Sequence, residues 1–326
     1  MRIAIVGAGA IGGFIGARLA LAGRDEVCAL ARGATLQALQ AQGWRLRSSG
    51  ALHQAPARAA DSAAALGQQD LVVIAVKGPA LSALAPQLAP LLGPQTVVLP
   101  AMNGVPWWFC QGLPGFEAPL DSVDPGGRIA AALPLAQVLG CVVHASAAMA
   151  EPGLVDHRMG QGLIVGEPVA GAPTARVDTV ADALAAAGFD LTRSSDVRRD
   201  IWYKLWGNLT MNPVSALCGV TMDKLLGDPL VLALCSRAMR EMAALGPRIG
   251  CTIDQTPEDR HVVTLKLGAF RTSMLQDADA GRPLELDSII AAVCEIGSRL
   301  GVELPAIEAI FGLTRVWARQ RGLYPV

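Results

Sequence analysis

The sequence predicts an α/β domain built on a parallel sheet, followed by an all-α domain. In the first part of the chain, short β-branched runs alternate with apolar segments of helical length, whereas nearly every segment after Asp200 has a helical pattern. Strands that alternate with helices are typical of parallel sheets, and helices alone form a layer of their own. A chain of 326 residues is also long for one domain. We expect the pattern to change near Ser194 and place the domains at 1–195 and 196–326.

The first strand–helix–strand unit lies in Met1–Arg32. The apolar run Ile3–Val6 leads into a glycine-rich turn, a segment of helical length and a second apolar run, Val27–Leu30. In the pattern G-x-G-x-x-G, the first glycine allows a tight turn, the second lets backbone approach a pyrophosphate, and the third lets the helix pack on the strand. The pyrophosphate binds the free N–H groups that begin the helix. We therefore predict a Rossmann-type dinucleotide-binding domain whose cofactor contacts are Gly7, Ala8, Gly9, Ala10, Ile11 and Gly12.

Two other interpretations of this stretch are weaker. Its charged start and apolar run as far as Ala17 loosely fit a secretory signal peptide. Its four-residue glycine spacings fit the packing face of a membrane helix. However, Arg18 and the charged cluster at 24–26 interrupt the run before it reaches the length of a membrane span.

The end of the second strand indicates which dinucleotide binds. NAD-binding domains usually place Asp or Glu there, where the carboxylate binds the ribose hydroxyls. This strand instead ends Cys28-Ala29-Leu30-Ala31-Arg32, without an acidic residue. Because a guanidinium pairs well with a phosphate, we predict NADP(H) as the cofactor and Arg32 as the ligand of its 2′-phosphate. The alternative is that Arg32 is a solvated loop charge.

The composition is that of a globular chain with ample core material. Hydrophobic residues make up 52% of the sequence and charged residues 17%, and the mean hydropathy is positive. The net charge of −1 gives no electrostatic case for nucleic acid or an anionic membrane as a partner. The seven cysteines contain no C-x-x-C pair, and the four histidines have no zinc-ligand spacing. We expect reduced core thiols, no metal site and a cytoplasmic location.

Two strand ends in this half carry candidate ligand-binding residues. The run Asp70–Lys77 predicts a buried parallel strand. Ligands bind at the carboxyl ends of such strands, so Lys77 can meet the cofactor; a plain edge lysine is the alternative. A helix over Leu81–Leu92 and a strand over Thr96–Leu99 follow. After that strand, Asn103-Gly104 forms either a simple turn or a donor and acceptor near the nicotinamide and the substrate.

The remainder of the first half combines a loop with a second set of strands. We expect Trp107–Pro134 to be a long loop, anchored by its two tryptophans, and such loops are uncommon unless functional. The strand-like runs after it are expected to extend the sheet in an antiparallel or mixed manner. The expected elements are strands at Val138–Val143, Gly153–His157 and Gly162–Val165, a helix at Thr174–Ala187 and a strand at Asp190–Arg193.

A polar stripe opens the second domain. Lys204, Asn208 and Asn212 recur at four-residue intervals among Trp, Leu and Met, so a helix aligns them on one side. Apolar surroundings lower the pKa of a lysine and suit it to protonating a ketone oxygen during hydride addition. The alternative is a solvated helix face, which the poor helix propensity of asparagine disfavours. Pro213 predicts that the helix breaks just after Asn212.

Together these motifs resemble the ketopantoate reductase (2-dehydropantoate 2-reductase) family over most of the chain. The matching pieces are the glycine turn, Arg32, Val76-Lys77, Met102-Asn103-Gly104, the stripe from Lys204 to Pro213, and Ser273-Met274-Leu275-Gln276-Asp277 with Glu285. The stripe and the last segment are specific, whereas the glycine motif is not. The resemblance implies NADPH-dependent reduction of a 2-oxo acid, foremost 2-dehydropantoate, in pantothenate and coenzyme A synthesis. It leaves a homodimer open.

The resemblance also implies residue roles. Lys204 is the expected proton donor to the 2-oxo oxygen, and Asn208, Asn212 and Ser273 are expected to bind the carboxylate and hydroxyl of the substrate. The residues expected near the cofactor are Arg32 and Lys77 on its adenosine side, Asn103 between cofactor and substrate, Glu285 at the nicotinamide ribose or beside Lys204, and Ser146 after the Gly140–Ala145 strand. Taken alone, Ser273 could equally be a neutral helix position and Glu285 a partner of a helix dipole.

Two rival functions stay open at this point. A β-hydroxyacid dehydrogenase has a similar build, with a Rossmann domain, a helical domain and a Lys-x-x-x-Asn pair. A non-catalytic NADP(H)-binding protein could retain the same fold. The chain also departs from the family pattern at Gly78-Pro79-Ala80, at Met222, where some members have a substrate-binding asparagine, and in its long loop. These departures bear on the exact substrate more than on the reaction.

Overall fold

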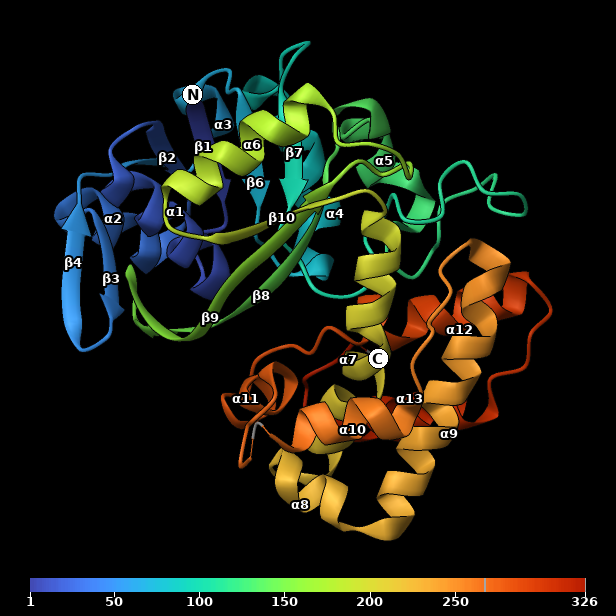
Figure 1. Cartoon of the computed structure of the whole chain (residues 1–326). Helices are drawn as coiled ribbons and strands as arrows, with labels where there is room; N and C mark the ends of the chain where they lie inside the picture. The colour runs from blue at the N-terminus through green and yellow to red at the C-terminus, as the bar shows by residue number, and fades with distance from the viewer. Residues whose placement is uncertain (267, 326) are drawn as a thin grey trace. The chain divides into compact units, whose positions relative to one another are not determined.

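The computed structural model describes residues 1–266 and 268–325. Its contacts divide the chain into two compact units (Figure 1): unit 1 comprises Met1–Met102 and Gly127–Asp200, and unit 2 comprises Asn103–Gly126 and Ile201–Val326. The α/β and helical classes predicted for the two halves are confirmed. The sequence-based division at residue 195 stays a prediction about domains, and it places Asn103–Gly126 with the first of them.

Unit 1 contains the predicted parallel sheet. Its strands lie in the order β5-β2-β1-β6-β7, and every neighbouring pair is parallel. The residues of β1 from Ile3 to Val6 are fully buried, as continuous apolar strands of parallel sheets usually are. The strand order reverses between β1 and β6, so the carboxyl ends of these two strands form the edge where ligands bind in such folds. The strands are β1 (Arg2–Val6), β2 (Glu26–Leu30), β5 (Arg58–Ala60), β6 (Leu71–Ile74) and β7 (Val97–Pro100).

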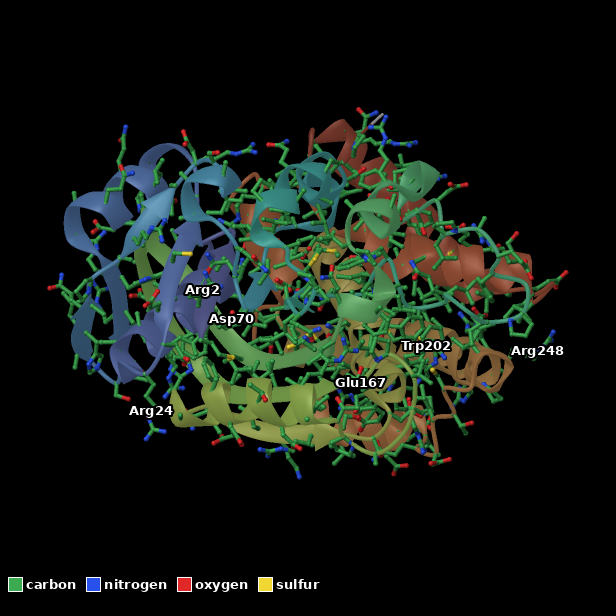
Figure 2. All side chains as sticks on the ribbon, turned by 90° about the horizontal axis from the view of Figure 1, so that it is seen from above. Arg2, Arg24, Asp70, Glu167, Trp202 and Arg248 are labelled. Atoms are coloured by element: carbon green, nitrogen blue, oxygen red, sulfur yellow. The ribbon has the colours of Figure 1, made fainter. Side chains whose placement is uncertain are left out.

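An ion pair between Arg2 and Asp70 lies at the amino-terminal ends of β1 and β6. The backbone N–H of Arg2 donates to a carboxylate oxygen of Asp70 at 2.7 Å, and the two side chains are 3.5 Å apart at their nearest charged atoms. Figure 2 labels both residues close together. The pair aligns the starts of β1 and β6, in register with the pairing of Ile3 with Leu71. The two strands therefore also end together, at Val6 and Ile74.

A second sheet of five strands stands in place of the predicted extension of the first. Strand β9 is continuous where two short strands were expected, and it pairs with β8, β3 and β10. Between the two sheets, the described residues have one isolated bridge, Val98 to Val138. The predicted single extended sheet is therefore wrong. The strands are β3 (Trp44–Ser48), β4 (Ala51–Ala55), β8 (Gly140–Glu151), β9 (Leu154–Gly166) and β10 (Asp190–Ser194).

Helix α1 (Ala10–Ala22) contacts both sheets, which explains its glycine-rich, all-round apolar sequence. A Cβ atom on Gly13 would lie 2.7 Å from Val155 of β9, and one on Gly16 would lie 2.4 Å from the ring of Trp44 of β3. Backbone can approach both sheets only where side chains are absent. The glycine spacings that resemble those of a membrane helix therefore belong to a helix that packs against two sheets. No helix among residues 1–266 and 268–325 is long and apolar enough to cross a membrane.

The other helices of unit 1 are short. The helix predicted over 81–92 begins earlier, as α4, and continues as a 3₁₀ helix, η1, that contains Pro90. Part of the predicted long loop is helical, in α5. These elements are α2 (Gly33–Gln42), α3 (Ala63–Leu66), α4 (Gly78–Leu84), η1 (Ala85–Leu91), η2 (Pro125–Gly127), α5 (Arg128–Ala132), η3 (Leu135–Gln137) and α6 (Ala175–Ala186).

Unit 2 is helical, and α9 contacts α8, α10 and α13 within it. Asp228 separates α8 from α9 and caps the second helix, since its side chain accepts hydrogen bonds from two N–H groups of α9. The elements are α7 (Val197–Cys218), α8 (Met222–Gly227), α9 (Pro229–Leu245), η4 (Gly246–Ile249), α10 (Pro257–Leu265), α11 (Ser273–Asp279), the π-helical η5 (Asp287–Ala291), α12 (Ala292–Arg299) and α13 (Pro305–Gln320).

The predicted break after Asn212 is wrong, since α7 continues through Pro213 to Cys218. Proline removes one N–H donor from the helix. Tertiary packing offsets that loss, because Ser215 and Ala216 are almost fully buried. The Ser215 hydroxyl also contacts the Asn212 carbonyl at 3.1 Å and the Thr272 hydroxyl at 2.6 Å. Interactions far along the chain therefore override the local helix-breaking tendency of proline.

The segment 103–126 is anchored in unit 2 by aromatic and ionic contacts. Trp107 and Trp108 are buried as predicted, and the ring of Phe109 stacks on Trp202 with centroids 5.9 Å apart; Figure 2 labels Trp202. A carboxylate of α12, Glu295, accepts hydrogen bonds from the backbone N–H groups of Asp121 and Ser122 at 3.0 and 2.9 Å. The segment predicted as a loop therefore packs as part of the helical unit.

The cysteines depart in part from the expectation of core thiols. All seven are free, and five of them are buried. Cys218, at the end of α7, is exposed, and Cys294 in α12 is partly buried. Burial raises the pKa of the Cys235 and Cys294 thiols to about 12, so both are held as neutral thiols.

Candidate functional site: a dinucleotide turn and a substrate-binding set

The glycine turn after β1 has the geometry that its sequence predicts. Gly7 has a φ of +89°, and a Cβ atom there would lie 2.5 Å from the side chain of Val76. A Cβ on Gly12 would lie 2.1 Å from the carbonyl oxygen of Gly7, so only glycine lets the helix begin this close to the strand. A Cβ on Gly9 would meet nothing within 4 Å. The open space therefore lies at the position where backbone is expected to approach a pyrophosphate.

The start of α1 is suited to an anion. Gly9 is its N-cap residue, and within the described chain no side chain caps the helix and no acidic residue lies in its first turn. The N–H groups of the first turn have no intrahelical acceptors, and the helix dipole is positive at this end. Ala8, Ala10 and Ile11 line the same turn without adding charge. These residues fit the diphosphate of a dinucleotide.

Arg32 and Lys77 both follow strands of the first sheet at its carboxyl edge. Arg32 is the exposed N-cap residue of α2, two residues after β2 ends, and its guanidinium lies 3.5 Å from the side-chain oxygen of Gln87. Lys77 is the partly buried N-cap residue of α4, three residues after β6 ends. Both cations therefore lie where cofactor phosphates are expected, while their ligands stay predictions.

Ser146 lies inside β8 rather than after a strand that ends at Ala145. It pairs with Met159 of β9 at a position where the register shifts on both sides, and it is partly buried. Such irregularities often re-aim side chains near functional sites. Its expected nearness to the cofactor stays a prediction.

Lys204 forms the central contact of unit 2. Its ammonium donates a hydrogen bond to the side-chain oxygen of Asn103 at 2.9 Å, and both side chains are partly buried. The two residues after Asn103 pack against the backbone of Ser288. The N–H of Val105 donates to the carbonyl of Ser288 at 2.7 Å. Gly104 has a φ of +82°, and a Cβ atom on it would lie only 2.4 Å from the carbonyl oxygen of Ser288. A lysine and an asparagine distant in sequence are thereby fixed as a pair.

The asparagines of the predicted stripe follow Lys204 along α7. Asn208 is partly buried, and Asn212 is only 5% exposed. Among residues 1–266 and 268–325, neither amide side chain has a hydrogen-bond partner. An amide group carries two N–H donors and one oxygen acceptor, all of which a polar ligand can engage. The two asparagines of the stripe are therefore available to hydrogen-bond a polar ligand.

Ser273 is the exposed first residue of a short helix, α11, and not a position inside a long one. The residue before it, Thr272, is the N-cap residue of α11 and contacts Ser215 of α7 through their buried hydroxyls. Because Ser215 is three residues after Asn212, this contact ties the start of α11 to the end of the stripe. Sequence reasoning missed both hydroxyls.

Glu285 lies in the irregular segment just before η5 and is partly buried. Its carbonyl accepts a hydrogen bond from Ile289 of that π-helix at 3.3 Å. Ser288, whose carbonyl supports the Asn103 turn, lies three residues further on. Single π-helical turns are frequent at functional sites. Unit 2 thus contains the predicted substrate-binding residues and Glu285, which is predicted at the nicotinamide ribose or beside Lys204. The substrate-binding residues are Asn103, Lys204, Asn208, Asn212 and Ser273.

The comparison with known proteins identifies the family of this chain. The family profile described as ketopantoate reductase PanE/ApbA matches residues 3–170, and its C-terminal counterpart matches residues 196–318. A 2-dehydropantoate 2-reductase of Mesorhizobium japonicum is 42% identical over 326 residues, which cover 99% of this chain and 100% of the relative. The chain belongs to the ketopantoate reductase family. Membership makes it a nicotinamide-dependent oxidoreductase.

Solved structures of other family members have the same fold. A putative ketopantoate reductase from Ralstonia solanacearum is 54% identical, with a TM-score of 0.95 and 99% of both chains covered. A 2-dehydropantoate 2-reductase from Geobacter metallireducens is 26% identical, with a TM-score of 0.85 over 97% of this chain and 100% of that one. In this family member, the residues 1–266 and 268–325 contain no cluster of His, Cys, Asp or Glu that could hold a metal ion.

Proposed function

We propose that this protein reduces a 2-oxo acid with NADPH, and that 2-dehydropantoate is the substrate. The observation that carries the proposal is the Lys204–Asn103 hydrogen bond of 2.9 Å. Along the same helix, the amides of Asn208 and Asn212 have no hydrogen-bond partner among the residues that the structure describes. A cation together with unused amide donors matches a substrate that has a carboxylate and a carbonyl oxygen. The product, pantoate, would enter pantothenate and coenzyme A synthesis, in the cytoplasm.

The cofactor part of the proposal rests on unit 1. The open space at Gly9 and the first turn of α1 would hold the diphosphate. Arg32 would pair with the 2′-phosphate that distinguishes NADPH from NADH, since no acidic residue follows β2 before it. Lys77 and Ser146 would add contacts along the cofactor. Bound NADPH supplies the hydride that adds to the 2-oxo carbon.

The side chains of unit 2 would stabilise the negative charge that develops on the substrate during the reduction. As the carbonyl oxygen gains negative charge, the Lys204 ammonium donates a proton to it, so that an alcohol forms rather than an alkoxide. The Asn103 carbonyl oxygen accepts from that ammonium and holds its direction. Asn208, Asn212 and Ser273 bind the carboxylate and hydroxyl of the substrate, and Glu285 contacts the nicotinamide ribose or adjusts Lys204. Pre-placed groups of this kind lower the barrier because they need not reorganise during the reaction.

A substrate panel is the direct test. Purified protein is assayed with NADPH and with NADH against 2-dehydropantoate, other branched 2-oxo acids and several 3-hydroxy acids. We expect turnover of 2-dehydropantoate to have the highest kcat/KM, with NADPH preferred. Turnover of a 3-hydroxy acid without any of 2-dehydropantoate would refute the substrate assignment and favour a β-hydroxyacid dehydrogenase. Binding of NADPH with no turnover of any compound would favour a non-catalytic binding protein.

Two substitutions test the residue roles. Lys204→Ala should reduce kcat at least about 100-fold, the usual size of a general acid contribution, while NADPH affinity stays near that of the unchanged protein. Lys224→Ala, an exposed lysine of α8, is the matched control. Arg32→Ala should weaken NADPH binding and leave NADH binding almost unaltered. Equal weakening of both dinucleotides would contradict the 2′-phosphate role.

A homodimer is part of the proposal. Leu313 and Val316 are 61% and 58% exposed on α13, although both are apolar. Two antiparallel copies of α13 would cover these apolar side chains with each other. Light scattering of the purified chain should give twice the chain mass. Leu313→Glu should give the monomer mass, and a monomer before substitution would refute the dimer.

A further inference from the structure

The chain reverses sharply after α13. Arg321 is the C-cap residue of this helix, and Gly322 follows with a φ of +66°. The N–H of Leu323 donates back to the carbonyl of Ala318 at 2.9 Å, and that of Gly322 donates to Arg319 at 3.0 Å. A glycine in the left-handed conformation with bonds of this kind is the common way to end a helix and redirect the chain. The turn thus ends α13 and changes the direction of the chain for residues 323–325.

This tail contacts the chain on both sides of Glu285. The carbonyl of Leu323 accepts a hydrogen bond from the N–H of Leu284 at 2.9 Å, and the hydroxyl of Tyr324 donates one to the carboxylate of Asp287. Leu284 directly precedes Glu285, and Asp287 is the first residue of η5, two positions after it. Glu285 itself lies between the irregular residues 282–284 and the start of η5.

The tail is itself held in place. Leu323 is only 4% exposed. The guanidinium of Arg319 lies 5.7 Å from the centre of the Tyr324 ring and donates a hydrogen bond to the carbonyl of Pro325 at 2.8 Å. Burial, followed by the contact with Asp287, raises the pKa of Tyr324, so its hydroxyl keeps the proton that it donates. A neutral donor facing a carboxylate makes a charge-assisted hydrogen bond.

We infer that the turn Gly322–Pro325 is a positioning element for Glu285, in which Leu323 and Tyr324 fix the backbone before and after this residue. Tyr324 thus acts through Glu285 and touches neither substrate nor cofactor. This inference rests on the proposed function, because it needs Glu285 to take part in the reaction. A displacement of a reacting group by about 1 Å can cost about 100-fold in rate. Loss of one of two anchors is therefore expected to cost less, about tenfold.

Tyr324→Phe is the main test, since it removes only the hydroxyl and keeps the ring under Arg319. We expect kcat for the 2-oxo acid to fall about tenfold. Amide hydrogen exchange in the peptide 284–291 should become faster, which a distant stability effect would not produce locally. Asp287→Ala should have the same effects from the other side of the hydrogen bond. Asp287→Asn, which keeps an oxygen acceptor, should retain most of the activity.

Two controls separate positioning from stability. Glu241→Gln weakens the other end of α13, where its carboxylate accepts from the N–H groups of Ala306 and Ile307. It should lower stability without altering kcat or the exchange of 284–291. In a Glu285→Ala background, Tyr324→Phe should have no further effect on kcat, because residues that act as one unit are not additive.

Several outcomes would overturn the inference. Full activity and unchanged exchange in Tyr324→Phe would remove the positioning role, and so would an equal loss of kcat with and without Glu285. Faster exchange in a protein that reduces no 2-oxo acid would refute the proposed function and leave the anchoring of the segment standing. The two hypotheses therefore fail separately.

Discussion

Substituting Gly104 by alanine should lower both activity and stability, because the turn that holds Asn103 has no room for a side chain. Gly104 has a φ of +82°, and a Cβ atom there would lie 2.4 Å from the carbonyl oxygen and 2.5 Å from the carbonyl carbon of Ser288. These contacts are with backbone, so no change of rotamer relieves them. The turn must move, and the hydrogen bond from Val105 to Ser288 breaks. Asn103 then leaves the Lys204 ammonium, which it contacts at 2.9 Å.

The size of the effect follows from a matched control in the same segment. Gly112 has a φ of +80°, but a Cβ there would meet nothing within 4 Å. Gly112→Ala should therefore cost only the backbone strain of the left-handed region, about 1 kcal/mol. Gly104→Ala should cost this strain and, in addition, about 1–3 kcal/mol for a buried N–H group left without its acceptor. The expected total is about 2–4 kcal/mol in the free energy of unfolding.

Urea unfolding and steady-state kinetics with NADPH and the 2-oxo acid measure the two effects. Gly104→Ala should lower kcat at least about tenfold, since Asn103 no longer directs Lys204. Gly112→Ala should keep the kcat of the unchanged protein. If the two variants lost stability and activity equally, the Ser288 contact would have no special role and the reasoning would be wrong.

Three further expectations follow from contacts described above. Gly9→Ala should fold with unchanged stability and bind NADPH more weakly, whereas Gly12→Ala should lose stability as well; thermal unfolding and cofactor titration distinguish the two. Ser215→Ala should lower the free energy of unfolding by about 1–3 kcal/mol, because it leaves the buried Thr272 hydroxyl without this partner. It should also raise KM more than the control Thr179→Ala, which removes an exposed hydroxyl of α6. Burial opposes ionisation of Glu295, but hydrogen bonds from Ser122, Asp121 and Arg299 outweigh it and hold the pKa of this carboxyl below its ordinary value. Its stabilising effect is thus present above the unfolded pKa, about 4.3, and is lost as the pH falls through the lower folded pKa. The stability difference between the unchanged protein and Glu295→Gln, measured by urea unfolding from pH 7 down to pH 3, should shrink on acidification; a constant difference would contradict the shift.

The elements predicted correctly from the sequence depend on neighbours in the chain. The turn from Gly7 to Gly12 needs its strand and helix, which adjoin it, and its steric reasons hold in the structure. The stripe from Lys204 to Asn212 needs only a helical period, which α7 supplies. These predictions succeed because spacing along the chain determines the relation between the residues.

The elements predicted wrongly depend on distant partners. Nothing near Pro213 indicates that Ser215 meets Thr272, a contact that helps the helix continue. The strands β8 and β9 have the expected pattern, but which strands they pair with is a long-range choice, and they pair in a second sheet. The sequence gives no indication of the roles of Ser288 and Glu295. Ser288 acts through its backbone carbonyl, and Glu295 binds a segment that is far away along the chain.

The assignment of residues 103–126 to the helical unit affects how this protein can be cut and recombined. The chain passes between the two units after Met102, after Gly126 and after Asp200, so neither unit is one continuous stretch of sequence. A fragment that ends at Asp200 would retain Phe109 but not the Trp202 ring on which it stacks. Chimaeras between family members should therefore exchange residues 103–126 together with the C-terminal part. A single crossover near residue 200 would join a segment from one parent to a core evolved in another.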